Sequence, residues 1–106
     1  MNRITVFGNV VRDVEIKVAE NEAQTKYARF TVASDRSTKG DSATDYFECV
    51  AFGDLAGDLG DLRKGVFVKI NGSMKMDVRR TEAETRYGWQ LRVTRIERAV
   101  QDEAIA

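Results

Sequence analysis

The amino-acid sequence predicts an all-β fold: a five-stranded antiparallel barrel with one short α-helix between the third and fourth strands. Apolar and polar residues alternate along most of the chain, which is typical of half-buried strands. Only residues 54–62 change to a helical period. The chain of 106 residues has the length of one domain, and five strands suit a small closed barrel better than a sandwich, which usually has seven or more.

The first strands are predicted over residues 3–10 and 13–20. The segment 3–10 is rich in β-branched residues and runs into Gly8–Asn9, which is a turn or bulge signal. The segment 13–20 alternates apolar with charged residues. We expect either two halves of one long bent strand or a strand and its returning extension.

The next two strands are predicted over residues 26–34 and 46–52, with a polar loop between them. In the first of them, one face holds Ala28, Phe30 and Val32. In the second, alternation places on one face Phe47, Cys49 and Ala51. The opposite face holds Tyr46, Glu48, Val50 and Phe52.

A short helix is predicted after these strands, because Leu55, Leu59 and Leu62 recur at helical spacing and form one apolar stripe. Asp54 is its expected N-cap and Gly65 its expected end. Two further strands complete the barrel, over residues 66–79 and 86–98.

The composition excludes most enzyme chemistry. The chain has no histidine and one cysteine, so it cannot build imidazole-based catalytic pairs or the common zinc sites. Asp54, Asp58 and Asp61 could hold a weak metal site on one helical face, but a solvated helix surface explains them more simply. We therefore expect no enzyme activity and no cofactor.

Charge and hydropathy give further limits. Basic and acidic residues balance at 17 each, so binding of a polyanion would depend on where the charges lie. No stretch reaches the roughly 20 apolar residues of a membrane span, and the first residues lack the long apolar run of a signal peptide. We expect a cytoplasmic protein with no membrane partner, in which Cys49 is a small buried hydrophobe.

This order of elements is that of the oligonucleotide/oligosaccharide-binding (OB) fold. That fold binds ligands on the face of its second and third strands and in the loops that join strands 1–2 and 4–5. Tyr46 and Phe52 share one face of the third predicted strand, and the charged Glu48 between them is ill-suited to a barrel interior. This face is therefore a candidate binding surface.

Five segments resemble the bacterial single-stranded DNA-binding protein (SSB) family, in order and at compatible spacing over residues 2–98. They are ITVFGNVVRDVEIK, FTVASDR, TDYFECVAFGDLA, LRKGVFVKINGSM and RYGWQLRVTRIE. The resemblance implies a homotetramer, associated with the nucleoid, that coats single-stranded DNA in replication, repair and recombination without sequence preference. We expect the OB-fold domain to span residues 1–99 and residues 100–106 to form a short flexible end.

The resemblance also implies that Tyr46 and Phe52 stack bases, because the matching family positions hold aromatic residues. Phe47, on the opposite face, is expected in the barrel core or near a subunit boundary. The predicted DNA-binding set joins the two stacking aromatics to seven basic residues along the phosphates: Arg3, Arg29, Tyr46, Phe52, Lys64, Lys75, Arg79, Arg80 and Arg86.

The sequence departs from the family pattern in three ways. Tryptophans that many members carry are missing near Thr38 and at Val78–Arg79, and the only tryptophan, Trp89, is expected in the core because it alternates with apolar residues. Glu48 is an acid on a surface that should bind an anion. The chain ends at QDEAIA without the linker and acidic tip of full-length members, so it is either trimmed or a short paralogue, and recruitment of other replication proteins is not expected.

Two other classes remain open. A barrel of this kind can serve as a protein–protein interaction or primosome-type assembly module with little DNA affinity, using the strand 2–3 face or an exposed strand edge. Its binding would depend little on salt. A carboxylate metal-dependent enzyme would require a tightly bound divalent ion at the aspartate-rich helix.

Overall fold

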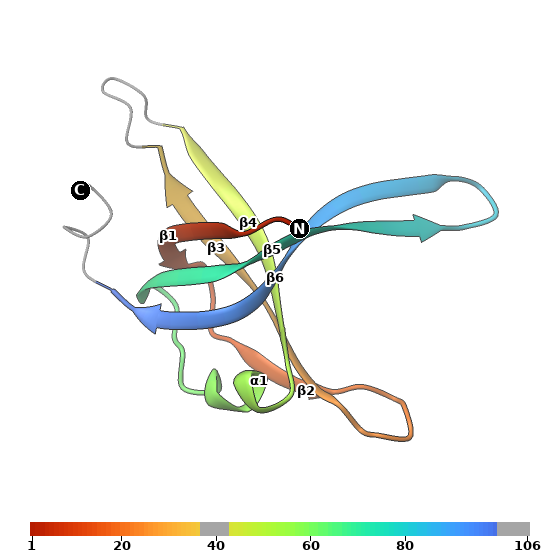
Figure 1. Ribbon diagram of the computed structural model, residues 1–106, viewed down its shortest axis with the longest axis horizontal. Coiled ribbons are helices and arrows are strands. Elements are labelled where there is room, and N and C mark those ends of the chain that lie inside the picture. Colours follow the sequence, from red (N-terminus) through yellow and green to blue (C-terminus); the bar gives the residue numbers. More distant parts are fainter. Residues whose placement is uncertain (37–42, 100–106) are drawn as a thin grey trace.

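The computed structural model describes residues 1–36 and 43–99, apart from the side chain of Arg79. The expectations for Thr38 and for residues 100–106 lie outside this range. The elements are shown in Figure 1: β1 (Ile4–Val10), β2 (Glu15–Val18), β3 (Lys26–Asp35), β4 (Thr44–Phe52), α1 (Asp54–Asp58), β5 (Phe67–Arg80) and β6 (Thr85–Arg98). A strand-rich chain with one short helix between β4 and β5 confirms the predicted fold class.

The strands form a closed ring. Their hydrogen-bonded order is β1-β5-β6-β4-β3-β2, and β1 also pairs with β3, which joins the sheet to itself. β1 and β2 follow one another along β3, since Val10 pairs with Val32 and Glu15–Val18 pair with residues 26–29. They are two halves of one bent strand, so the ring has the five strands of an OB-fold barrel.

One pair of strands in the ring is parallel, where the sequence expectation was antiparallel throughout. β4 and β6 meet in parallel at Cys49 with Leu91 and at Val50 with Arg92. The other pairs in the described chain are antiparallel. Alternation predicts a strand and its two faces, but the direction of strands far apart in sequence depends on how the ring closes.

The interior of the barrel is filled by the faces that alternation predicted to be buried. Those of β3 and β4 contribute Ala28, Phe30, Val32, Cys49 and Ala51. Gly8 of β1 passes close to β3, where an added Cβ would stand 2.3 Å from the carbonyl oxygen of Ala33. Only glycine permits this approach, which brings β1 against β3 and closes the ring.

The helix is shorter than predicted and begins differently. Gly53, with φ of 68°, is the N-cap, so Asp54 lies in the first turn and makes no side-chain cap. The helix ends at Asp58, because the glycines in this segment weaken a helical backbone, and Gly65 lies in the loop before β5. Leu62 of the predicted stripe is nevertheless buried. The described chain has no helix long and apolar enough to cross a membrane.

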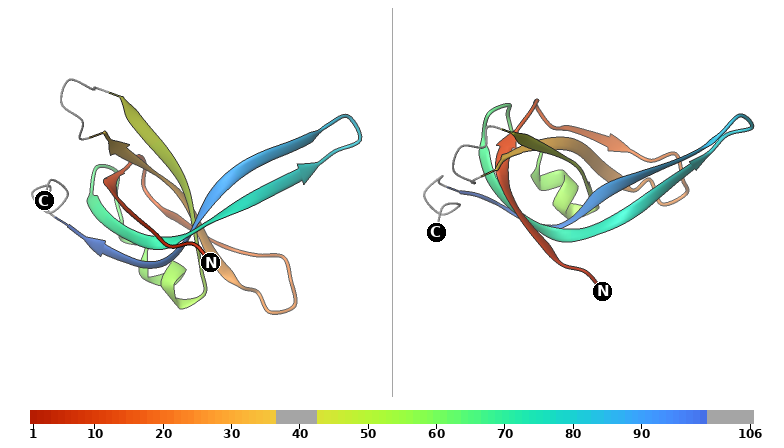
Figure 2. Two further views of the ribbon diagram at one scale, coloured as in Figure 1. Left: turned by 45° about the horizontal axis from the view of Figure 1, so that its top comes forward. Right: turned by 90° about the horizontal axis from the view of Figure 1, so that it is seen from above.

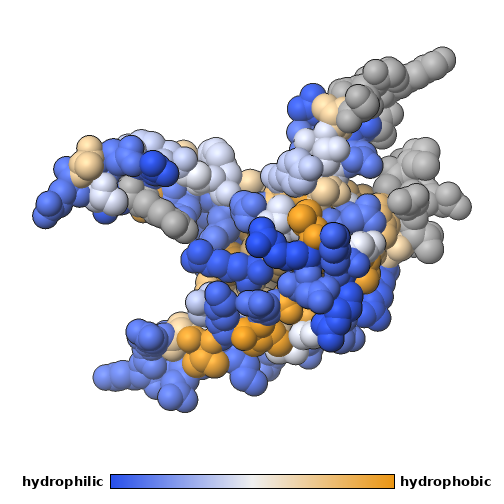
Figure 3. Space-filling model, turned by 180° about the vertical axis from the view of Figure 1, so that it is seen from behind, coloured by the Kyte–Doolittle hydropathy of each residue, from blue (hydrophilic) through white to orange (hydrophobic). Residues whose placement is uncertain are grey.

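Three hairpins extend from the barrel in different directions (Figures 1 and 2). They are formed by β2–β3, β3–β4 and β5–β6. The β5–β6 hairpin has 14 residues in each strand. Its outer part, residues 75–90, continues beyond the barrel as a two-stranded ribbon, which we call the arm. Figure 3 shows this arm standing clear of the body when the molecule is seen from behind.

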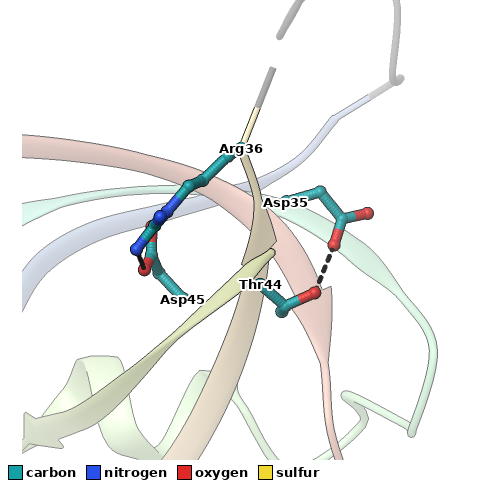
Figure 4. A network of polar contacts seen from close by, with 4 residues as sticks. All are labelled: Asp35, Arg36, Thr44 and Asp45. Carbon is teal, nitrogen blue, oxygen red and sulfur yellow. Dashed lines mark hydrogen bonds and ion pairs between the residues drawn. The ribbon is translucent and has the colours of Figure 1, made fainter. Parts of the chain in front are cut away.

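Polar contacts join the ends of β3 and β4 (Figure 4). Arg36 donates from Nε and Nη2 to the carboxylate of Asp45 at 3.2 and 3.0 Å, and Thr44 Oγ1 donates to Asp35 at 2.9 Å. The hydrogen bonds from Arg36 lower the pKa of Asp45 from its ordinary value of 3.8. Because both charged side chains are about half exposed, the pair adds little to stability, but it fixes the strand ends next to Tyr46.

Candidate nucleic-acid interface

The outer face of β3 and β4 carries the two aromatic residues predicted to bind DNA. The antiparallel register sets Phe52 opposite Tyr27 and Tyr46 opposite Ala33. Directly opposite residues share a face of a sheet, so aromatic rings stand at both ends of this face. Tyr46 is 66% exposed and Phe52 is 41% exposed, which leaves ring surface open to a ligand.

Arg92 of β6 reaches the same face. Its guanidinium carbon Cζ lies 4.7 Å from the centre of the Phe52 ring, within the range of a cation–π contact. The parallel contact between β4 and β6 places it there, since Arg92 pairs with Val50. Arg92 was not predicted from the sequence. Its position between the buried Leu91 and Val93 is the signal that marks it as outward-facing.

Glu48 brings a negative charge to the middle of this face. Its carboxylate accepts hydrogen bonds from the Thr31 hydroxyl, at 3.0 Å to Oε1 and 3.1 Å to Oε2. Thr31 is directly opposite in register and only 8% exposed, so it anchors the acid. Between Tyr46 and Phe52, such a carboxylate repels phosphate and can accept hydrogen bonds from base amino groups.

Arg29 lies where two hollows meet. One hollow of about 280 Å³ lies between β4 and the β5–β6 arm and is lined in part by Tyr87. The other, of about 350 Å³, lies over β2 and β3 and is lined in part by Lys17. Arg29 and Glu48 line both of them. A continuous shallow path therefore runs from β2 across the outer face of β4 to the arm.

The predicted basic residues of the arm divide between this path and other surfaces. Arg86 lines the hollow beside the arm, and its Nε donates to Glu84 at 2.7 Å. Arg80 is exposed near the arm tip. Lys75 lines a different hollow beside β1 and β5, together with Arg3. The structure thus separates Arg3 from Tyr46 and Phe52 rather than placing it on their face.

Lys64 and Arg79 complete the predicted set. The backbone N–H of Lys64 donates to Asp13 Oδ1 at 2.8 Å, and Asp13 lines the hollow over β2 and β3. Lys64 is therefore next to one end of the path. Arg79 lies on β5 opposite Arg86, and its side chain is outside what the structure describes.

Trp89 is 59% exposed, so the expectation that it lies in the core was wrong. It does share a strand face with Leu91, which is 0% exposed. The part of β6 that comes before Leu91 in the chain, however, lies outside the barrel. There the same strand face is exposed to solvent instead of packing in the core. Tyr87, two residues further along this face, is 68% exposed and was not predicted as a site residue.

Cys49 is an inert buried thiol, as the sequence predicted. It is 2% exposed, and its Sγ lies 3.5 Å from the carbonyl oxygen of Phe47. Burial, together with the nearby charge of Glu48, raises the pKa of the thiol to about 12. A thiol held neutral in this way is a poor nucleophile and a poor metal ligand.

The aspartates near α1 do not form a metal centre. Asp61 instead accepts a hydrogen bond from Arg98 at 3.5 Å. Over residues 1–36 and 43–99, no group of three or more His, Cys, Asp or Glu side chains could hold a metal ion.

A small closed barrel with exposed aromatic and basic residues on its outer face is an OB-fold binding domain. The chain matches the Single-strand binding protein family over residues 1–99. It is 33% identical over 90 residues to a single-stranded DNA-binding protein of Fusobacterium nucleatum subsp. nucleatum, covering 79% of this chain. It is 32% identical over 100 residues to one of Staphylococcus epidermidis, covering 91% of this chain and 74% of that protein.

The chain therefore belongs to the single-strand binding protein family, which confirms the resemblance seen in the sequence. The matched segment spans 57% of the length of the Fusobacterium relative. The family model that matches residues 1–99 is one of binding proteins.

Proposed function

We propose that the protein binds single-stranded DNA without sequence preference, by stacking bases on aromatic side chains and by pairing phosphates with basic side chains. The observation that supports this most is the exposed pair Tyr46 and Phe52 on one face of β4, with Arg92 against the Phe52 ring. Both relatives are named for binding single-stranded DNA.

Tyr46 and Phe52 would hold different bases of one strand. They are six residues apart on a strand that rises about 3.3 Å per residue, so their separation is about 20 Å. Every base has a flat π-face, which makes stacking on such rings tolerant of sequence. Arg92 covers one face of Phe52, so a base would take the other face, with the guanidinium close to the backbone phosphate.

Basic side chains along the path would carry the phosphates. Arg29 lies in its middle, at the meeting point of the two hollows. The others assigned to this role are Lys64, Arg79, Arg80, Arg86 and Arg92, whereas Arg3 and Lys75 line a separate hollow beside β1 and β5 and would contact phosphates only where the strand leaves the path. Asp58 and Asp61 line a separate hollow beside α1. The two hollows of the path are themselves lined by acids, Asp13, Glu15, Glu48 and Asp77, as well as by basic residues, so binding of a polyanion depends on how these charges are arranged along the path.

We also propose that the protein assembles as a homotetramer, and β1 supports this. Its residues 4–8 pair with β5 on one side, while β1 pairs with β3 only at Asn9 and Val10 in the described chain. The first half of β1 thus offers a strand edge to a second copy. Phe47, which is half-buried, and Phe7 line a hollow of about 470 Å³ beside this edge.

In the cell, such a protein would coat and protect single-stranded DNA during replication, repair and recombination, in the cytoplasm at the nucleoid. The binding domain would span residues 1–99. Light scattering during size-exclusion chromatography would test the tetramer: a mass of four chains is expected, and a monomer would contradict it.

The binding itself is tested with a fluorescently labelled oligo-dT of about 35 nucleotides, titrated at several salt concentrations. A duplex of the same length serves as the control. We expect tight binding to the single strand, weak binding to the duplex, and an affinity that falls with salt at a slope of about −0.7 per phosphate contact.

Failure to bind the single strand even at low salt would contradict the proposed function. The protein-binding barrel considered from the sequence would then be the better assignment, and its binding would show little dependence on salt.

A further inference from the structure

Glu48 is an acid at the centre of a surface proposed to bind a polyanion. It is exposed on the outer face of β4 and lines both hollows of the path. An ionised carboxylate only accepts hydrogen bonds. Within a single strand of DNA, the phosphates and the deoxyribose rings carry no N–H or O–H group. The bases are therefore the part of the strand with which Glu48 can form hydrogen bonds.

The carboxylate of Glu48 is held in place and still has acceptor positions for a ligand. The Thr31 hydroxyl donates its one proton to it, at 3.0 Å from Oε1 and 3.1 Å from Oε2. Thr31 is only 8% exposed, so this anchor is fixed in the sheet. The ion pairs within the described chain lie on other carboxylates. A carboxylate has about four acceptor positions, so both oxygens of Glu48 can accept further hydrogen bonds.

The four bases differ in what their Watson–Crick edges offer to a carboxylate. A single strand leaves these edges open to a protein. Guanine has two neighbouring donors, N1–H and N2–H2, which match the two oxygens of a carboxylate. Adenine and cytosine each have one amino group beside an acceptor nitrogen, and thymine has one N–H between two carbonyl oxygens. Only guanine can therefore donate to both oxygens at once without placing an acceptor against one of them.

Arg29 is suited to the remaining polar atom of the guanine edge, the acceptor O6. It pairs with Val50, so it is the diagonal neighbour of Glu48 across β3 and β4. Such neighbours are about 7–8 Å apart and lie within reach of long side chains. Both residues line the hollow of about 280 Å³ between β4 and the arm. A guanidinium only donates hydrogen bonds, so the two side chains together match a donor–donor–acceptor edge.

We propose that Glu48 binds guanine, accepting hydrogen bonds from N1–H and N2–H2 while Arg29 donates to O6. This inference rests on the proposed function and adds a base preference to it at one position of the strand. Glu48 is two residues from Tyr46, which is about 7 Å along a strand, so the guanine would be the neighbour of the base stacked on Tyr46. The stacked bases would still be held without regard to their identity.

The alternative is that Glu48 only repels phosphate. Repulsion would lower the affinity for every strand by the same factor, whatever its bases. A contact with guanine would instead depend on particular atoms of one base. Glu15 provides the matched control, because it is exposed and lines the hollow over β2 and β3 together with Glu48. Removing its charge changes the repulsion and leaves the guanine contact intact.

Three labelled strands of equal length separate these roles: oligo-dT, and the same strand with scattered thymines replaced by guanine or by deoxyinosine. Deoxyinosine keeps the N1–H and O6 of guanine but lacks the N2 amino group. In anisotropy titrations at one salt concentration, the wild type should bind the guanine strand about tenfold more tightly than oligo-dT and should lose most of this gain with deoxyinosine. Glu48→Gln should bind the three strands alike, with a small gain on oligo-dT from the lost repulsion. Glu15→Gln should keep the guanine preference.

Equal binding of the three strands by the wild type would overturn the guanine contact and leave the proposed function standing. A preference that survives in Glu48→Gln would assign the guanine contact to other residues, and one that is lost in Glu15→Gln as well would assign it to net charge. Both results would overturn the role of Glu48. Absence of binding to every strand would overturn the proposed function too. Unchanged melting temperatures would show that the variants fold, and the comparison of guanine with deoxyinosine needs only the wild type.

Discussion

The face of β4 and the β5–β6 arm present similar side chains on different supports. Tyr46 and Phe52 stand on a sheet whose other face is packed core, formed by Cys49 and Ala51. Tyr87 and Trp89 stand on a two-stranded ribbon whose other side faces solvent. The alternation of residues determines on which face of a strand a side chain lies. Whether that face packs in the core or is exposed to solvent depends on how far the barrel extends along the strand.

The supports also differ in how firmly they hold a ring before DNA arrives. On β4, Phe52 is backed by its sheet and by Arg92, and Tyr46 lies next to the polar contacts at the strand ends. On the arm, the rings stand on two paired strands, β5 and β6, with no further sheet layer described behind them. A rigid platform loses less entropy on binding, so the β4 face should contribute more affinity per ring than the arm.

The largest difference between barrel and arm is expected in the free energy of unfolding, when a residue of each is replaced by alanine on the same face of β6. Leu91→Ala removes a side chain that is 0% exposed and should lower the free energy of unfolding by about 2–5 kcal/mol. Trp89→Ala, on the exposed arm, should change it by less than about 0.5 kcal/mol. Urea unfolding followed by circular dichroism measures both. If both variants lost the same free energy of unfolding, Trp89 would be as well packed in solution as Leu91, and the arm would not differ from the barrel in this respect.

The next effect is on DNA affinity at the β4 face. Tyr46→Ala and Phe52→Ala should each weaken binding of oligo-dT by about 1–3 kcal/mol, because each loses one stacked base. Tyr46→Phe is the matched control, since it keeps the ring, and it should bind like the wild type. Anisotropy titrations at one salt concentration provide the comparison. Losses larger for Tyr87→Ala than for Tyr46→Ala would reverse the proposed ranking of the two sites.

Stability should depend on pH at high pH because of the thiol of Cys49, which is buried in the barrel. The pKa of Cys49 is raised from 9.0 to about 12 in the folded state. Stability from the neutral thiol is therefore complete below pH 9 and is lost as the pH rises from 9 toward 12, by at most about 1.4 kcal/mol per unit. Thermal melts of the wild type and of Cys49→Ala should diverge in this window. Parallel curves would mean that the thiol is not buried.

The smallest expected effect concerns the acid between the two rings of the β4 face. Glu48→Gln keeps a hydrogen-bond partner for Thr31 and removes the charge that repels phosphate, so affinity should rise by less than about 1 kcal/mol. The gain should shrink at high salt, because screening weakens the repulsion. Asp58→Asn, beside α1, is the matched control and should change nothing. Weaker binding by Glu48→Gln would indicate that the carboxylate accepts hydrogen bonds from bases.

Much of the barrel could be predicted from the sequence because strand faces have a period of two. Ala28 and Val32 are buried and Tyr46 is exposed, as alternation indicates. The helix was predicted from its leucines, but its early end at Asp58 depends on glycines whose effect is set by packing.

The rest of the candidate site depends on contacts between distant strands. Arg92 lies over Phe52 only because β6 meets β4 in parallel at a particular register, which a single sequence does not encode. Trp89 was assigned to the core because alternation cannot tell where β6 leaves the barrel. The alternation of residues thus predicts the two faces of each strand. How the strands close into a barrel, and how far β5 and β6 extend beyond it, can be seen only in the structure.

The parallel contact between β4 and β6 has a further consequence for local opening. The register joins these strands at only two positions, Cys49 with Leu91 and Val50 with Arg92, whereas the pairing of β5 with β6 runs along nearly their whole length. The barrel therefore has a short seam here, between two hairpins that are each held by their own ladders, in addition to the short contact of β1 with β3 that closes the ring. In native-state hydrogen exchange, the amides of this seam should open at lower free energy than those of β5 and β6, with both hairpins intact. Separation at the seam would turn the arm about the β4 face and alter the distance that a bound strand must cross.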